Sequence, residues 1–81
     1  MPPSLRSRRH QRLAELIAEY RDAAGLKQSE VAGRLGRHQP FVSGIESGQR
    51  RVDLIELIDL AEVIGFDPAA LIEELRNTPR E

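Results

Sequence analysis

The sequence of 81 residues has no cysteine and no tryptophan, and Tyr20, Phe41 and Phe66 are its only tyrosine and phenylalanine residues. Without cysteine, neither a disulfide framework nor a zinc–thiolate site can form. The two histidines, His10 and His38, have no further ligand near them at a spacing typical of metal sites. We therefore expect neither a metal nor another cofactor.

Long hydrophobic runs are also missing. No apolar segment approaches the roughly 18 residues of a membrane-spanning helix, and the first residues lack the apolar core of a signal peptide. The sequence shows no paired carboxylates of a catalytic cleft, no nucleophile–base set and no phosphate-binding glycine loop. We therefore expect a cytoplasmic protein that makes no membrane contact and is not an enzyme. Its length predicts one small domain, whose modest core depends on close helix packing or on a partner subunit.

The net charge of −1 conceals an uneven distribution of charge. Residues 1–51 hold ten Lys and Arg against five Asp and Glu, a net of +5. Residues 52–81 hold two basic residues against eight acidic ones, a net of −6. A polyanion responds to the local electric field of the surface that it meets. The first part of the chain is therefore suited to binding nucleic acid, although the net charge of the whole chain is negative.

Apolar residues recur with helical spacing, and glycines separate the segments that carry them. In the first segment Leu13, Leu16, Ile17, Tyr20 and Ala24 form one stripe. No strand pattern or internal repeat competes with this interpretation. The sequence predicts an all-α fold with a flexible tail over 1–5, a C-terminal tail over 77–81, and one domain over 6–76 with five helices at about 6–24, 28–35, 39–47, 54–64 and 68–76.

The segment from Leu26 to Gly48 is the most informative part of the chain. Its two short helical patterns each have an apolar side, and Gly36 separates them where a C-cap glycine is expected. One helix then braces the other, which is how a helix-turn-helix presents side chains to the DNA major groove. The apolar positions are Val31, Ala32 and Leu35 in the first pattern, and Phe41, Val42 and Ile45 in the second.

This segment resembles the Cro/repressor-type (XRE-type) helix-turn-helix regulators. The matching residues are Leu26, Gln28, Ala32, Gly36, Gln39, Val42, Ser43, Ile45, Glu46, Gly48 and Arg50, with Val31 in place of a leucine and further matches at Leu57, Ala61 and Gly65. The resemblance implies a five-helix, lambda-repressor-like DNA-binding domain. It also implies that Arg21 and Glu46 form a structural ion pair between the first and third helices.

The resemblance places DNA contacts around the second and third helices. The predicted base-reading residues are Gln39, His38, Arg37 and Ser43. The predicted contacts to the DNA backbone are Gln28, Lys27, Arg50 and Arg51. Physical reasons accompany these roles, since a glutamine amide can bond N6 and N7 of adenine together, and a helix start can bind a phosphate.

Blander interpretations remain open for several of these residues. Gln28 and Gln39 are also compatible with ordinary exposed helix starts, Ser43 with a small packing residue and His38 with a turn residue. The arginines at the start of the first helix are compatible with phosphate contacts or with a solvated surface; they are Arg6, Arg8, Arg9 and Arg12. Phe41 and Tyr20 are predicted to lie in the core.

Besides Val31, three positions depart from the family pattern. Lys27 replaces a threonine, which removes an N-cap hydroxyl worth about 0.5–2 kcal/mol but adds a positive charge. Pro40 disfavours a helical conformation at the preceding residue, so Gln39 is predicted to be the N-cap of the third helix. Gly44 leaves an outward position bare, so base reading is predicted to be sparse and partly replaced by recognition of DNA shape.

The sequence thus predicts a sequence-specific DNA-binding transcriptional regulator that binds double-stranded DNA as a homodimer. The predicted dimer interface consists of Phe66, Leu71, Ile72 and Leu75. The alternative function is that of an antitoxin, which binds a partner toxin through another surface and uses DNA binding to regulate its own expression.

Overall fold

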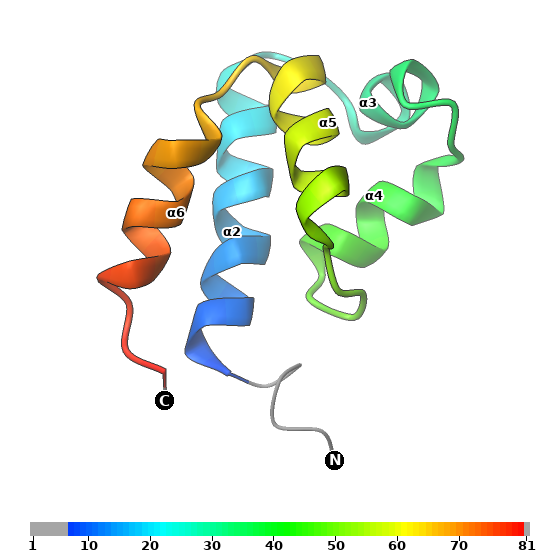
Figure 1. Ribbon diagram of the computed structural model, residues 1–81. Helices are drawn as coiled ribbons and strands as arrows, with labels where there is room; N and C mark the ends of the chain where they lie inside the picture. Colours follow the sequence, from blue (N-terminus) through cyan, green and yellow to red (C-terminus); the bar gives the residue numbers. More distant parts are fainter. Residues whose placement is uncertain (1–6, 81) are drawn as a thin grey trace.

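The computed structural model describes residues 7–80, which contain five α-helices and no strand. The helices are α2 (Arg8–Ala23), α3 (Gln28–Arg34), α4 (Gln39–Glu46), α5 (Leu54–Ile64) and α6 (Pro68–Arg76). In Figure 1, α3 and α4 lie on one side of α2 and α5, and α6 lies on the other. The all-α, five-helix prediction is confirmed, whereas the predicted tail over 1–5 and Arg6 lie outside the described residues.

Side-chain caps determine where most helices begin. Asp53 accepts a hydrogen bond from the Glu56 N–H at 2.7 Å, and Asp67 accepts one from the Ala69 N–H at 2.9 Å. These two caps place the starts of α5 and α6 where the sequence predicts them. The first described helix begins at Arg8 rather than at residue 6, because Ser7 is its N-cap and accepts from the His10 N–H.

The start of α4 differs from the prediction. Gln39 is the first helical residue, and the N-cap is His38, in an extended conformation with φ −96° and ψ 156°. Pro40 therefore occupies the second helical position, where its missing N–H would have had no acceptor within the helix. The restriction that proline imposes on the preceding residue is outweighed at this helix start.

The core receives at least one fully buried side chain from every helix. The largest are Ile17, Val31, Val42, Ile45, Leu60 and Leu71, each less than 2% exposed. Leu71, predicted to contact a second subunit, is 0% exposed within the single chain, so this prediction is wrong. The apolar stripe of α6 turns Leu71 into the core, which leaves it no surface for a partner.

Packing holds α4 at the edge of the domain. α4 contacts α3 and α2, and α3 also contacts α5. Gly36, in the turn between α3 and α4, has a φ of +69°. Residues with a Cβ atom rarely adopt this left-handed backbone conformation. This turn reverses the chain sharply, so that one side of α4 packs on the core and the other faces outward.

The segment after α6 packs against the start of α2. The Arg9 Nε donates to the Thr78 carbonyl at 2.9 Å, and the Arg8 N–H donates to the Arg80 carbonyl at 3.3 Å. The part of the predicted C-terminal tail that the structure describes is thus bound to the domain. None of the helices within residues 7–80 is long and apolar enough to cross a lipid bilayer.

Two leucines of α5 allow a matched test of the core. Leu60 is 0% exposed and Leu54 is 64% exposed. We expect Leu60→Ala to lower the free energy of unfolding by about 2–5 kcal/mol, because it leaves a cavity. Leu54→Ala should change it by less than about 0.5 kcal/mol. Urea unfolding of both variants measures the difference, and equal losses would contradict the described core.

Candidate nucleic-acid interface

An ion pair between α2 and α4 forms the centre of the site. Arg21 donates from Nε to Glu46 Oε2 at 2.6 Å and from Nη2 to Glu46 Oε1 at 2.9 Å. The side chains of Arg21 and Glu46 are only 16% and 7% exposed. Arg21 also donates from Nη1 to the Leu26 carbonyl at 2.8 Å, so one guanidinium joins α2, the segment before α3, and α4.

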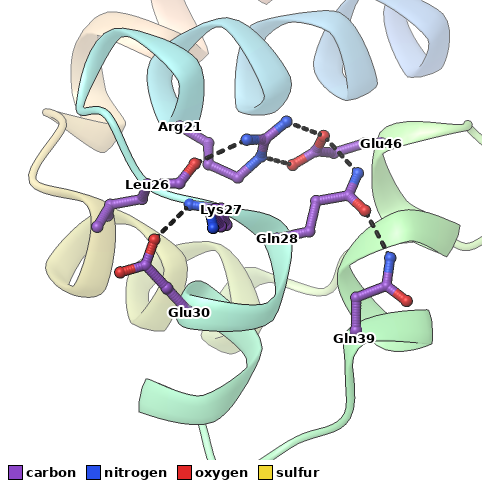
Figure 2. Close-up of polar contacts among 7 residues, drawn as sticks. All are labelled: Arg21, Leu26, Lys27, Gln28, Glu30, Gln39 and Glu46. Carbon is purple, nitrogen blue, oxygen red and sulfur yellow. Dashed lines mark hydrogen bonds and ion pairs between the residues drawn. The ribbon is translucent and has the colours of Figure 1, made fainter.

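Two glutamines extend this pair to the start of α4. Gln28 donates from Nε2 to Glu46 Oε1 at 2.9 Å, and Gln39 donates from Nε2 to Gln28 Oε1 at 2.7 Å. Figure 2 shows that hydrogen bonds link the four side chains one after another, from Arg21 to Glu46, then to Gln28 and finally to Gln39. We refer to these four residues as the polar chain.

Chemistry fixes the direction of every bond in the polar chain. An ionised carboxylate only accepts, so Glu46 requires the amide nitrogen of Gln28 to face it. The Gln28 oxygen then faces Gln39, which donates a hydrogen bond to it from its own amide nitrogen. Gln39 is exposed, and within residues 7–80 its second amide N–H and its carbonyl oxygen have no partner and are available to another group.

The structure changes what is expected of Gln28 and Lys27. One amide N–H of Gln28, predicted to reach a phosphate, is already bonded to Glu46. Lys27 is the N-cap of α3, and its backbone N–H donates to Glu30 Oε1 at 2.9 Å. Glu30 thus supplies a bond at the helix start although the threonine hydroxyl is missing. The exposed Lys27 ammonium makes no ion pair within residues 7–80.

A second cluster joins α4 to α5 through charges and an aromatic ring. The guanidinium carbons of Arg37 and Arg50 each lie 4.4 Å from the centroid of the Phe41 ring. Arg50 makes a bidentate pair with Glu56, at 2.9 Å from Nη1 to Oε1 and 2.8 Å from Nη2 to Oε2. Arg37 Nη2 lies 3.9 Å from Glu56 Oε2. We call Arg37, Phe41, Arg50 and Glu56 the arginine clamp.

The clamp shifts the ionisation of its carboxylate. The hydrogen bonds from Arg50 lower the pKa of Glu56 below its ordinary value of 4.5, against the opposing effect of desolvation. A further bond from the Asp53 N–H acts in the same direction. Glu56 is therefore ionised at neutral pH, and it neutralises part of the positive charge beside α4.

The other residues predicted to contact DNA differ in their exposure and in whether their side chains already have a partner in the protein. Arg51 is exposed, and its guanidinium makes no hydrogen bond or ion pair within the described part of the chain. Ser43 is half-buried, and its hydroxyl donates to the Pro40 carbonyl of its own helix at 3.2 Å. His38 is exposed at the start of α4. Arg51 is consequently the free cation of the loop that follows α4.

Glu56 and His10 make contacts in this region but were not among the predicted site residues, and Phe41 was predicted only as a core residue. Glu56 completes the arginine clamp, and the spacing Asp53-x-x-Glu56 is a capping-box pattern that places such a glutamate back toward the preceding loop. His10 lies with Nε2 3.0 Å from the Gly48 carbonyl and so joins α2 to the end of α4. No sequence pattern that we recognise indicates this second contact.

The predicted dimer residues are also distributed differently from the expectation. Phe66 is half-buried and stacks on Tyr20, with ring centroids 4.6 Å apart, and Leu75 packs partly on the core. Ile72 remains 41% exposed. The other exposed large apolar residues within 7–80 lie on α5 and are Leu54, Ile55 and Ile58.

Comparison with known proteins agrees with the five-helix fold. A family model described as a helix-turn-helix domain matches residues 12–75. The solved structure of an XRE-family like protein from Pseudomonas syringae pv. tomato is similar, with 50% identity, a TM-score of 0.78, and coverage of 84% of this chain and 83% of that one. The chain belongs to the XRE-type family of helix-turn-helix DNA-binding transcription regulators.

Two further relatives extend the likeness. One is the uncharacterized HTH-type transcriptional regulator y4dJ of Sinorhizobium fredii, 36% identical over 63 residues, which are 78% of this chain and 82% of the relative. The other is the solved structure of the restriction-modification controller protein C.AhdI from Aeromonas hydrophila. It is 34% identical, with a TM-score of 0.68 and coverage of 73% of this chain and 86% of that one.

The polar chain should contribute strongly to stability. Glu46→Gln keeps the shape of the side chain but removes the charge and one acceptor, so we expect a loss of about 1.5–3 kcal/mol in the free energy of unfolding. The matched control is Glu73→Gln, because the Glu73–Arg76 pair is exposed and worth about 0–1 kcal/mol. Chemical denaturation of both variants gives the comparison. A loss for Glu46→Gln no larger than that of the control would show that the polar chain is not structural.

Proposed function

We propose that the protein is a sequence-specific transcriptional regulator that reads DNA with Gln39 and binds a two-fold operator as a homodimer. The observation that carries this proposal is the free edge of the Gln39 amide. Its remaining N–H can donate to N7 of adenine while its oxygen accepts from the N6 amino group, which is the bidentate pairing that distinguishes adenine in the major groove. Gln28 and Glu46 support this role because they fix the orientation of that amide.

The neighbouring residues complete the proposed interface. Arg37 and His38 precede α4, and Ser43 lies one turn after Gln39, so all three are proposed to contribute to base reading. Lys27 at the start of α3 and Arg51 after α4 are proposed to contact phosphates on the two sides of the recognition helix. The side chain of Gln28 acts through Gln39, and its position at the helix start leaves its backbone N–H available to a phosphate.

The dimer follows from the small reach of one recognition helix. A single helix contacts only a few base pairs, and a two-fold dimer reads two half-sites about 34 Å apart. Exposed apolar side chains on α6 and α5 support an interface there, with Ile72 at its centre and Phe66 and Leu75 at its edge. Sedimentation at micromolar concentration tests the dimer, and a monomer alone would contradict it.

Selection from a random pool of duplexes is the decisive test of the function. We expect enrichment of a site with two symmetric halves, whose centres lie about one helical turn apart. Failure to enrich any sequence would contradict specific DNA binding. The antitoxin alternative would gain support if a stoichiometric partner protein co-purified with the chain from its native cell.

Gln39→Ala tests base reading. We expect the free energy of binding to the selected duplex to become weaker by about 1–3 kcal/mol, because the adenine contact is lost. The preference for one base pair at the contacted position should also relax. Gln11→Ala, an exposed glutamine on α2, serves as the control and should bind normally. Binding titrations against duplexes altered at each position measure both effects. Equal losses on selected and arbitrary DNA would remove Gln39 from the base-reading residues.

Arg51→Ala tests the phosphate contact. Each phosphate contact contributes about 0.9 to the slope of log K against log salt concentration, so this variant should flatten the slope by about that amount on every duplex. Arg76→Ala removes the same charge from α6, which lies on the opposite side of the domain from α3 and α4 (Figure 1). Titrations at several salt concentrations compare the two variants, and an unchanged slope for Arg51→Ala would exclude this contact.

A further inference from the structure

We propose that Glu56 determines how selectively the protein binds DNA, by holding Arg50 and Arg37 against Phe41 and keeping Arg50 from binding phosphates of any sequence. This proposal rests on the proposed DNA-binding function. Glu56 is a positioning residue here, since it acts through the arginines and does not itself contact DNA. One carboxylate from the acidic segment 52–81 thereby acts on the two arginines that flank α4.

The arginine clamp connects both ends of the recognition helix to α5. Arg37 lies in the turn before α4, Arg50 lies in the loop after it, and Phe41 lies in its first turn. Glu56 lies in the first turn of α5 and contacts Arg50 directly. One carboxylate and one aromatic ring therefore hold the segments on both sides of α4 in fixed positions.

The bonds of Arg50 leave it poorly placed to bind phosphate. Its Nη1 donates to Glu56 at 2.9 Å and to the Arg51 carbonyl at 2.7 Å, and its Nη2 donates to Glu56 at 2.8 Å. The bidentate geometry that binds a carboxylate is the same geometry that an arginine uses for a phosphate, so Glu56 competes directly with the DNA backbone. Arg51, the next residue, has no such competitor.

This competition affects arbitrary and selected duplexes differently. Binding to arbitrary DNA depends almost entirely on phosphate neutralisation, so it increases with each arginine that is free to move. Binding to a selected site also needs the recognition helix in one position, which the clamp supports. Removing the charge of Glu56 should therefore raise the affinity for arbitrary DNA more than the affinity for the selected duplex.

Glu56→Gln isolates the charge from the helix start. Glutamine is accepted at the third position of a capping box, so the bond from the Asp53 N–H is retained. On a 30-base-pair duplex of arbitrary sequence we expect the salt slope to steepen by about 0.9, which corresponds to about eightfold tighter binding in 0.1 M salt. The ratio of affinities for the selected and arbitrary duplexes should fall.

Two further variants make the experiment specific to the clamp. Glu62→Gln removes the same charge from the exposed surface of α5 and should leave the salt slope unchanged. In an Arg50→Ala background, Glu56→Gln should no longer steepen the slope, because the arginine that it releases is absent. Thermal unfolding of each variant confirms that it is folded.

Several outcomes would overturn the proposal. If Glu56→Gln lowers the affinity for both duplexes equally and leaves the salt slope unchanged, Glu56 has a purely structural role. If neither the affinities nor the slope change, Glu56 has no role in DNA binding. A steeper slope that persists without Arg50, or that Glu62→Gln reproduces, would assign the effect to net charge. A failure of the proposed function is distinguishable, since the unaltered protein would then show no preference between the two duplexes.

Discussion

The carboxylate of Glu46 is the constraint on which the rest of the interface depends. Because it can only accept hydrogen bonds, it fixes the position of the Arg21 guanidinium on one side and the orientation of the Gln28 amide on the other. The same side chain thus connects the packing of α2 on α4 to the direction in which Gln39 presents its amide. Stability and the proposed base reading therefore both depend on this one acceptor, and a substitution of Glu46 is expected to change the two together.

Different interactions hold the two ends of α4, the proposed recognition helix. At its start, the polar chain orients Gln39, and at its end His10 contacts the Gly48 carbonyl. The arginine clamp adds an ionic connection to α5, which comes from the acidic part of the chain. These contacts add to the core packing of Val42 and Ile45 in holding a short helix of 8 residues in place. For the proposed DNA reading by α4, such preorganisation favours binding because less conformational entropy is then lost.

Much of the fold follows from local sequence signals, and much of the site does not. Glycines, aspartate caps and apolar periodicity place α5 and α6 at their predicted bounds. The prediction that Gln39 is the N-cap of α4 was wrong, because the effect of Pro40 on the preceding residue depends on its position in the helix. The dipeptide Gln39-Pro40 alone does not determine that position. The burial of Leu71 and the pairing of Arg50 with Glu56 were not predicted, and both have a tertiary cause. Periodicity identifies an apolar side but not its partner, and an arginine in a basic loop gives no sign that a carboxylate six residues later will bind it.

Pro40 has a consequence for the kind of contact that α4 can make. The first turn of a helix normally offers several free backbone N–H groups to an anion. Here proline lacks one of them, and the Phe41 N–H donates to the His38 carbonyl at 2.9 Å. Only the N–H of Gln39 is left among the first three positions of α4. The tip of this helix is therefore a weak anion binder, so the proposed recognition of DNA by α4 depends on its side chains more than on backbone N–H groups that would attract any phosphate.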